Sequence, residues 1–355
     1  MQEIKFIKSE NLKQKPKDIS KVVFGTLFSD YMFSMDYEKD KGWINPTIEE
    51  YKDIPLSPSN STLHYGQAIF EGMKAYKTVN GDVTVFRPLD HLNRLNRSAR
   101  ILDIPEIDVE FVKDALFKLV EIEKDWIPTE KGASLYIRPF IFSNDANLGV
   151  SVAKRYKFMI ILSPVSAYYS AGFAPVKIMV EDKHVRAVIG GLGEAKTPAN
   201  YAASLHAGVV AHQKGYHQVL WLDGVNRKYI EEVGSMNILF KIGGKIVTPA
   251  LSGSILDGIT RKTVLEIAKS WGYEVEERKI SIDELCECYD NGSLEEVFGS
   301  GTAAVISPVG ELLYKDKKMV INDGKVSDFS LKMFNYITSL QQGTEKDNFG
   351  FVAKV

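Results

Sequence analysis

The chain alternates between segments whose apolar residues follow a helical period and short runs of apolar residues that are typical of strands. After Pro88, a helix that carries Arg94 is predicted by apolar residues three or four positions apart, at Leu89, Leu92, Leu95, Ala99 and Leu102. The same spacing predicts a second helix at Val112, Leu116 and Leu119. Two further helices are expected in the second half of the chain. One begins at Asn200 as N-cap and ends near Lys214, before Gly215, and the other covers residues 260–271.

Strands are predicted between these helices. In the first half they are expected at residues 83–86, 133–137 and 156–162. In the second half, two turns, Asp223-Gly224 and Gly243-Gly244, are each flanked by apolar runs, which predicts two hairpins.

The order of these elements predicts an α+β protein with two unequal domains rather than a regular βαβ repeat. Prolines, serines and a glycine in residues 163–175 predict a linker between the domains. We therefore expect a smaller N-terminal domain at residues 1–162 and a larger C-terminal domain at residues 176–355. A chain of 355 residues is long enough for two separate cores.

Composition excludes some classes of partner. The formal net charge of −2 argues against nucleic acid or an anionic membrane held by bulk electrostatics. The start of the chain lacks the apolar core of a signal peptide, and the most apolar stretch, at 158–162, is too short to span a bilayer, so the expected location is the cytoplasm. Cys286 and Cys288 do not have the spacing of a zinc site, no histidine is near them in the sequence, and ordinary thiols are expected.

The segment 190–201 contains the most informative residue, Lys196. It stands between a glycine-rich stretch and a predicted helix start, where the backbone can curve around a small cavity. A lysine in such a place can become an amine nucleophile that forms a Schiff base with an aldehyde cofactor. Further along, Glu232 stands at the end of a short predicted strand. A lysine of this kind and a carboxylate for the pyridinium nitrogen are the pair that pyridoxal phosphate chemistry requires.

The segments 190–201 and 230–237 together resemble the branched-chain amino acid aminotransferases, which are pyridoxal phosphate enzymes of fold type IV. Further blocks in the order of that family lie at residues 63–74, 93–95, 136–139, 256–261 and 297–303. The resemblance extends from about residue 20 to the C-terminus. It implies a two-domain fold-type IV structure with pyridoxal 5′-phosphate as cofactor. It also implies that the amino group of L-leucine, L-isoleucine or L-valine passes to 2-oxoglutarate in a ping-pong reaction.

The resemblance implies roles around the cofactor ring. Lys196 would hold the cofactor and move the proton, Glu232 would pair with the pyridine nitrogen, and Tyr201 would bind the phenolic oxygen. Neighbouring strand residues point to opposite faces, so only one of Glu231 and Glu232 is expected to reach the ring. The family motif selects Glu232, and Glu231 is expected to face water.

The phosphate group needs a cation and backbone donors. Arg94 offers a forked guanidinium, and Ile259 and Thr260 open a helix whose first amides favour an anion. Thr302 would add a hydroxyl and the amides of a turn. Arg186 is a weaker candidate for the same region.

The substrate pocket has to accept both an apolar side chain and a γ-carboxylate. The aromatic residues that match the family are Tyr65, Phe70, Tyr136 and Tyr168. Arg138, with tyrosine hydroxyls, would bind the acid. The α-carboxylate would lie near Thr302 and Ala303, with Ser235 close by, where many members of the family have threonine. Leu148 and Val150 match residues that reach across from a partner subunit, so the resemblance implies a homodimer.

Three alternatives remain open on the sequence. Residues 191–197 look faintly like the phosphate-binding loop of an NTPase, but Ala195 stands where that loop needs glycine, and Pro198 disturbs the helix that should follow. D-amino acid transaminase and aminodeoxychorismate lyase share fold type IV and are typically shorter chains. The D-specific enzymes have an Arg-x-His trap in the region where this chain has Arg138-Pro139-Phe140.

Overall fold

A computed structural model describes residues 3–166 and 173–355, which fall into two compact units. Unit 1 comprises Met1–Ser170, Ala195–Pro198 and Thr338–Val355. Unit 2 comprises Ala171–Glu194 and Ala199–Ile337. This division differs in two places from the boundaries expected from the sequence, because the four residues around Lys196 and the C-terminal segment pack with unit 1.

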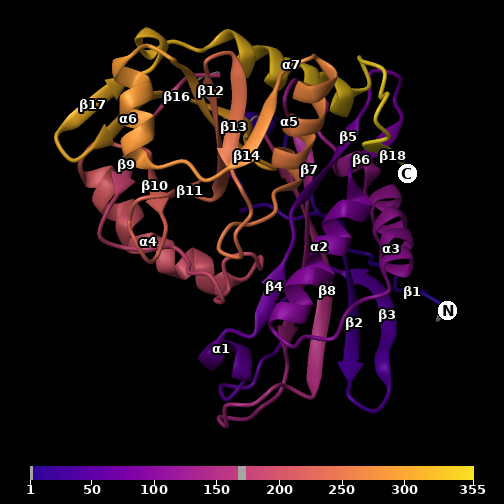
Figure 1. Cartoon of the computed structure of the whole chain (residues 1–355). Coiled ribbons are helices and arrows are strands. Elements are labelled where there is room, and N and C mark those ends of the chain that lie inside the picture. Colours follow the sequence, from indigo (N-terminus) through magenta and orange to yellow (C-terminus); the bar gives the residue numbers. More distant parts are fainter. Residues whose placement is uncertain (1–2, 167–172) are drawn as a thin grey trace. The chain divides into compact units, whose positions relative to one another are not determined.

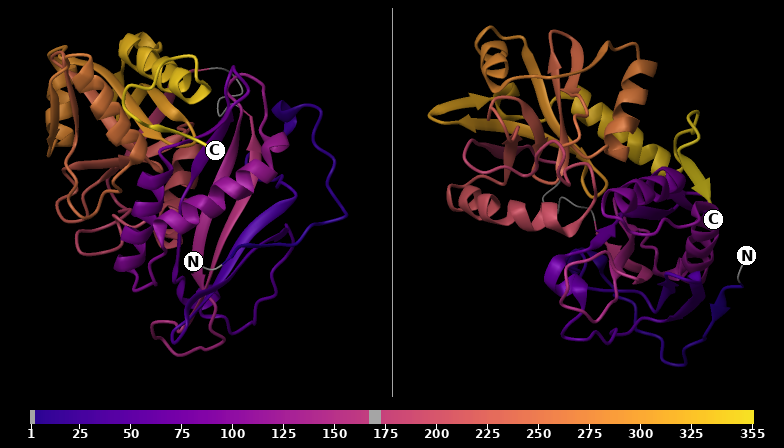
Figure 2. Two further views of the ribbon diagram at one scale, coloured as in Figure 1. Left: turned by 90° about the vertical axis from the view of Figure 1, so that its right-hand side faces the viewer. Right: turned by 60° about the horizontal axis from the view of Figure 1, so that its bottom comes forward.

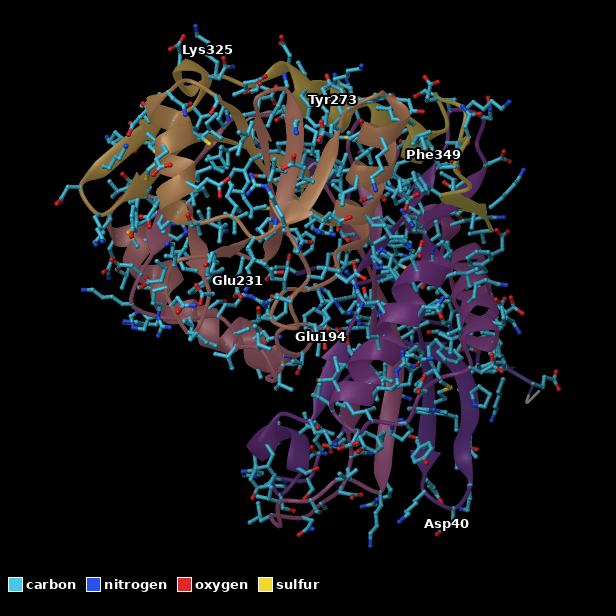
Figure 3. The ribbon with its side chains drawn as sticks, viewed as in Figure 1. Asp40, Glu194, Glu231, Tyr273, Lys325 and Phe349 are labelled. Atoms are coloured by element: carbon cyan, nitrogen blue, oxygen red, sulfur yellow. The ribbon has the colours of Figure 1, made fainter. Side chains whose placement is uncertain are left out.

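Unit 1 is built on a sheet in the order β1-β3-β2-β8-β7-β5-β6-β18, with β4 paired to β7 (Figure 1). Its pairings are antiparallel except for the parallel β1–β3 pair. The strands are β1 (Lys5–Phe6), β2 (Tyr31–Glu38), β3 (Gly42–Glu50), β4 (Ala68–Phe70), β5 (Met73–Lys77), β6 (Val83–Phe86), β7 (Ser134–Ser143), β8 (Arg155–Val165) and β18 (Val352–Lys354). Asp40 marks the tip of the β2–β3 hairpin (Figure 3).

The helices of unit 1 are α1 (Ser61–Tyr65), α2 (Pro88–Ile101) and α3 (Val109–Ile122). Helix α2 begins with Pro88, whose fixed φ suits a first helical turn, and Asp108 caps α3 by accepting the amide of Phe111. The apolar faces of both helices pack into one core with the sheet, and both helices can be followed along the sheet in Figure 2. These two helices and the strands predicted at 83–86, 133–137 and 156–162 are therefore confirmed, with small differences at their ends.

Unit 2 contains a sheet in the order β11-β10-β9-β16-β15-β12-β13-β14, with β17 paired to β16. Strand β11 also pairs with β12, so the strands from β11 through β9, β16 and β15 to β12 form a closed ring. The strands are β9 (Val176–Glu181), β10 (Gln218–Leu222), β11 (Ile230–Val233), β12 (Met236–Ile242), β13 (Lys245–Pro249), β14 (Val275–Arg278), β15 (Leu294–Gly301), β16 (Val305–Tyr314) and β17 (Lys317–Val320). Both hairpins predicted in this half, β10–β11 and β12–β13, are confirmed.

Helices cover the strands of unit 2 (Figure 1). They are α4 (Pro198–Gln213), α5 (Ile259–Ser270), α6 (Ile282–Asp290) and α7 (Asp328–Gln342), of which α7 passes into unit 1 at Thr338. Ile282 and Leu285 of α6 join the main core of the unit. Ala207 and Ala211 of α4 pack in a second cluster that contains Trp221.

Two predictions about chain segments need correction. The helix expected from Asn200 begins at Pro198, and Asn200 does not cap it, because its side-chain amide is buried and donates to the carbonyl of Leu192 at 2.7 Å. The expected linker begins later than residue 163, because Ser163–Val165 continue β8 in register with β7. Residues 167–172 of that linker lie outside the described part of the chain.

In residues 3–166 and 173–355, no helix is long and apolar enough to cross a membrane. Over the same residues, no cluster of histidine, cysteine and carboxylate side chains could hold a metal ion. Cys286 and Cys288 lie on α6 as free thiols.

Glu123, at the C-terminal end of α3, is a buried carboxylate with an altered pKa. Its side chain accepts the backbone amide of Tyr31, and the residue is 2% exposed. Burial, with the nearby charge of Asp30, raises its pKa to about 7. The unfolded chain therefore loses this proton at a lower pH than the folded chain, and stability falls as pH rises through the window between the two pKa values.

Replacing Glu123 by glutamine should remove this fall in stability at high pH. We expect Glu123→Gln to be more stable than the parent at about pH 8, by roughly 1–3 kcal/mol, and the difference to shrink below about pH 4.5. Urea unfolding at the two pH values measures it. Glu110→Gln, at an exposed glutamate of α3, is the control and should change stability little at either pH. A Glu123→Gln effect that does not vary with pH would contradict the explanation.

Candidate active site

The backbone on both sides of Lys196 is held by unit 1. Its amide donates to the hydroxyl of Ser98 on α2 at 2.9 Å, and its carbonyl accepts the amide of Phe70 on β4 at 3.0 Å. The hydroxyl of the next residue, Thr197, donates to the carbonyl of Ala68 at 2.8 Å. The Nζ atom of Lys196 lies 5.0 Å from the ring centroid of Phe70, in the range of a cation–π contact. The backbone of Lys196 is therefore held by two elements at once, α2 and β4.

Arg138 lies against the same aromatic ring. Its Cζ atom is 4.6 Å from the ring centroid of Phe70 and 5.3 Å from that of Tyr136, and its Nη2 donates to the Tyr136 hydroxyl at 3.0 Å. Tyr136 and Arg138 are two positions apart on β7 and so share a face of the sheet. The buried Nε of Arg138 has no hydrogen-bond partner among the described residues. The structure thus brings together Phe70, Tyr136, Arg138 and Lys196, four of the residues predicted from the sequence.

Gly72 makes room for Tyr136. A Cβ atom at position 72 would lie 2.0 Å from the hydroxyl oxygen of Tyr136, which is closer than any real contact. Of the two glycines in the block 63–74, Gly72 is therefore required to leave room for the Tyr136 side chain.

Arg94 is buried in unit 1 and bound to a residue that sequence reasoning did not single out. Its Nε and Nη2 donate to the two carboxylate oxygens of Glu71 at 2.7 and 2.9 Å. His91, one helical turn before Arg94 on α2, lies with Nδ1 2.8 Å from Oε2 of Glu71. Burial alone would raise the pKa of Glu71, but the charge of Arg94 and the hydrogen bonds from both neighbours hold that pKa well below its usual range. The only signal for Glu71 was its place in the block 63–74.

Tyr65, Leu148 and Val150 form a separate group in unit 1. Tyr65 ends α1, and its hydroxyl donates to the carbonyl of Leu148 in the loop between β7 and β8. Leu148 and Val150 are 58% and 83% exposed. The hydroxyl of Tyr65 thus ties the end of α1 to this loop, and its ring lies beside that of His64. Tyr168 lies outside the described residues.

Glu232 is the centre of the candidate residues in unit 2. It is buried on β11, and its Oε1 accepts the amide of Leu256 at 3.0 Å and the side-chain amide of Asn237 at 3.3 Å. Asn237 on β12 also donates to the carbonyl of Leu256 at 2.9 Å. Asn237 was not predicted as a site residue, although it ends the segment 230–237. It ties the carboxylate to the loop that leads into α5.

Arg186 lies beside Glu232, and its expected part in holding the phosphate stays a prediction. Its Nε is 2.7 Å from Oε2 of Glu232, an ion pair that lacks the alignment of a hydrogen bond. Its Nη2 donates to the carbonyls of Gly193, at 3.1 Å, and of Ser254. The guanidinium therefore joins the carboxylate to two loops.

The expectation that Glu231 faces water is wrong. Glu231 is 5% exposed, and its Oε1 accepts the hydroxyl of Ser254. Its Oε2 has no hydrogen-bond partner in the described part of the chain, and burial raises its pKa. The rule of alternation fails here because every residue of β11 is buried, within the closed ring of strands (Figure 3, where Glu231 is labelled).

Strand register brings two turns to one end of the ring. Asn237 pairs with Glu232 on one side and with Ser300 on the other. Ser235 lies two residues before Asn237, in the β11–β12 turn. Thr302 lies two residues after Ser300, in the β15–β16 turn, and is followed by Ala303. Ser235, Thr302 and Ala303 therefore lie at the end of the ring that holds Glu232.

The first turn of α5 is the candidate anion site of unit 2. Gly258 is its N-cap, and within the described chain no side chain caps the amides that begin with Ile259 and Thr260. A Cβ atom at position 258 would lie 1.8 Å from Oδ1 of Asn237, so glycine is required there. Tyr201 lies on the first turns of α4, and its carbonyl accepts the hydroxyl of Ser204.

The two groups carry complementary chemistry. Unit 1 holds an amine beside an aromatic ring, together with two arginines, while unit 2 holds an ion-paired carboxylate and a set of amides at strand and helix ends. Such groups can bind an anion, hold a basic ring nitrogen and move a proton at an amine. Each of these groups is of a kind that amino-group transfer uses.

The family model for amino-transferase class IV matches residues 68–312. The chain therefore belongs to this family, whose fold it shares.

Curated relatives cover nearly the whole chain. It is 53% identical over 343 residues to a Bacillus subtilis (strain 168) protein named branched-chain-amino-acid aminotransferase 2, covering 96% of this chain and 94% of the relative. It is 54% identical over 351 residues to a Staphylococcus aureus (strain N315) protein named probable branched-chain-amino-acid aminotransferase. That match covers 99% of this chain and 98% of the relative.

Solved structures agree with this fold. The branched-chain amino acid aminotransferase from Escherichia coli superposes with a TM-score of 0.74 at 28% identity, covering 91% of this chain and 98% of that one. A second branched-chain amino acid aminotransferase, solved with pyridoxamine 5′-phosphate, superposes with a TM-score of 0.72 at 26% identity. The match covers 90% of this chain and 97% of that one. The expected α+β fold of type IV is thus confirmed.

The close approach of two loops of unit 2 depends on Gly193. A Cβ atom there would lie 2.3 Å from the carbonyl oxygen of Ser254, which accepts Arg186. We expect Gly193→Ala to lower the free energy of unfolding by roughly 1–3 kcal/mol, because backbone has to move. Gly208→Ala on α4 is the control, since no described atom lies within 4 Å of its Cβ position. It should stabilise by up to about 1 kcal/mol. Thermal unfolding compares the two, and equal shifts would refute the steric argument.

Proposed function

We propose that this chain is a pyridoxal 5′-phosphate-dependent transaminase that moves the amino group of L-leucine, L-isoleucine or L-valine to 2-oxoglutarate. The observation that carries the proposal is Lys196, whose backbone is fixed on both sides and whose amine lies beside an aromatic ring. The substrate class is supported by the names of relatives that are more than half identical over almost the full chain.

The residues present fit this cofactor. Its aldehyde needs an amine, which Lys196 offers, and its phosphate needs a cation and amides, which Arg94 and the uncapped first turn of α5 offer together with Thr302. Its ring nitrogen needs a carboxylate, which Glu232 offers. Its phenolic oxygen would be bound by Tyr201. When bound, pyridoxal 5′-phosphate supplies an electron sink for the pair left at the substrate Cα when the proton departs.

The protein side chains then do the positioning and the proton transfer. Nζ of Lys196 would accept the proton that leaves the substrate Cα and hold it for return. Glu232, ion-paired with Arg186, would face the ring nitrogen and hold a proton there. Arg186 thus contributes to cofactor binding through this carboxylate, which is the role its position supports.

The substrate-recognition roles follow from the chemistry of the individual residues. The rings of Phe70 and Tyr136 would contact an apolar side chain, and Arg138 would bind the γ-carboxylate of 2-oxoglutarate or L-glutamate. The orphaned Nε of Arg138 supports this role, because a buried donor without a partner suits a ligand oxygen. Ser235, Thr302, Ala303 and their amides would bind the α-carboxylate.

We further propose a homodimer. The exposure of Leu148 and Val150, on a loop whose carbonyl is bound by Tyr65, supports contact with a second copy of the chain. Tyr168 is retained as a substrate-pocket residue on the family motif alone. We keep the cytoplasm as the proposed location, since both cysteines are free thiols.

The geometry does not favour the NTPase alternative. Residues 195–198 are bound to β4 and α2 of unit 1 instead of forming a loop whose amides cradle a phosphate. The relatives favour the branched-chain enzymes over the D-specific and lyase members of the fold.

The proposal is tested by the visible absorption of the purified protein loaded with pyridoxal 5′-phosphate. L-Leucine should remove the yellow band of the bound aldehyde form, and 2-oxoglutarate should restore it. A band that responds only to D-alanine would favour a D-amino acid transaminase. A protein that takes up no pyridoxal 5′-phosphate would overturn the proposal.

Lys196→Ala should abolish transamination, with a loss of roughly 10³-fold or more, because the amine that moves the proton is missing. Borohydride should also trap no covalent adduct between cofactor and protein. Lys214→Ala, at the end of α4, is the control and should behave like the parent. Retained activity in Lys196→Ala would contradict the assignment of this lysine.

Arg138→Ala should slow the half-reaction with 2-oxoglutarate more than the half-reaction with L-leucine, by roughly 10-fold or more, since only the former substrate carries the second carboxylate. Single-turnover absorption measurements separate the two. Arg100→Ala is the control, because Arg100 is an exposed arginine of α2. Equal loss in both half-reactions would mean that Arg138 is structural.

A further inference from the structure

Glu71 is the centre of a buried charge network in unit 1. Glu71 is fully buried, and its Oε1 accepts a hydrogen bond from Nε of Arg94 at 2.7 Å. Its Oε2 is shared by Nη2 of Arg94 at 2.9 Å, Nδ1 of His91 at 2.8 Å and the amide of Gly72 at 3.2 Å. Both oxygens are therefore occupied, and the plane of the guanidinium is fixed by two parallel bonds.

The charge state of the network follows from these contacts. Arg94 and His91 hold the pKa of Glu71 far below its usual range against the effect of burial, so Glu71 is ionised. Burial lowers the pKa of His91, which is also near the charge of Lys196. A neutral His91 that faces a carboxylate with Nδ1 must carry its proton there, so it donates. Glu71 and Arg94 form a neutral pair.

The same two short elements hold the network and Lys196. On α2, His91, Arg94 and Ser98 stand at positions i, i+3 and i+7, which places them along one face of the helix. Ser98 accepts the amide of Lys196. Glu71 directly follows Phe70, whose amide binds the carbonyl of Lys196. A displacement of Glu71 would therefore reach the arginine and the lysine segment together.

We infer that Glu71 is a positioning residue for phosphate recognition: it orients the guanidinium of Arg94, with His91 as its second anchor. The inference rests on the proposed function, in which Arg94 binds the phosphate of the cofactor. Arginine has several flexible torsions, and an arginine fixed in advance loses less conformational entropy when it binds an anion. Glu71 acts only through Arg94 and is not a catalytic residue.

The test measures how strongly the apoprotein prefers pyridoxal 5′-phosphate over pyridoxal, which lacks the phosphate. Dissociation constants for both compounds are determined by absorption titration for the parent, Glu71→Gln, Glu71→Asp and Arg94→Ala. Glu123→Gln is the matched control, because Glu123 is a buried glutamate of the same unit that binds a backbone amide instead of an arginine.

Glu71→Gln should reduce the preference for the phosphate form by roughly 10-fold or more, with pyridoxal affinity within about 2-fold of the parent. Glu71→Asp keeps the charge and shortens the side chain by one methylene, so it should lie between the parent and Glu71→Gln. Glu123→Gln should keep the parent preference.

An unchanged preference in Glu71→Gln would overturn the inference, and so would an equal loss of affinity for both compounds, which indicates a purely structural role. If Glu71→Gln does not fold, Glu71→Asp is judged by the same criteria. Failure of both to fold would assign Glu71 to stability alone and would also overturn it. Arg94→Ala separates the two proposals. If it keeps the parent preference, the phosphate role of Arg94 in the proposed function fails; if it loses the preference while Glu71→Gln keeps it, only the role of Glu71 fails.

Discussion

The hydrogen bonds that fix the backbone of Lys196 are the constraint on which the proposed chemistry depends. A lysine side chain has four rotatable bonds, and a loop would leave its amine without a defined position. Here its amide is bound by Ser98 of α2, and its carbonyl is bound by Phe70 of β4. The residues around it, Phe70 and Arg138, are placed by the same sheet. The lysine backbone and the groups that would recognise its substrate thus belong to the same unit.

Unit 2 places two adjacent buried carboxylates in different surroundings. Glu232 receives an ion pair from Arg186 and hydrogen bonds from Leu256 and Asn237. Its neighbour Glu231 has the hydroxyl of Ser254 but an oxygen without a partner in the described chain, and its pKa is raised by burial. Glu232 thus has a cation beside it, whereas Glu231 has only the hydroxyl of Ser254 within the described chain. The ring of strands makes both environments possible, since it buries both faces of β11.

Sequence patterns within a few neighbouring residues predicted individual helices and hairpins. The helices α2 and α3 and the hairpins of unit 2 were accessible because a helical period and a turn signal are contained in a few neighbouring residues. The partners of the candidate residues were not accessible, because strand register and the meeting of distant loops decide them. Glu71 reaches Arg94 across 23 positions of sequence, and Arg186 meets Ser254 across 68. Glu231 was misjudged because alternation assumes one wet face. Motif resemblance supplied the candidate residues themselves but could not say which of them touch.

The neutral pair of Glu71 and Arg94 also bears on the order in which the protein is assembled. A buried arginine that waited for an anion from outside would oppose folding until that anion arrived. Arg94 has its counter-charge within the same unit, at Glu71 in the short connection between β4 and β5. Unit 1 therefore does not need a phosphate compound to neutralise Arg94 while it folds. A phosphate ligand that binds only the folded chain would still add to its stability, because such binding shifts the folding equilibrium.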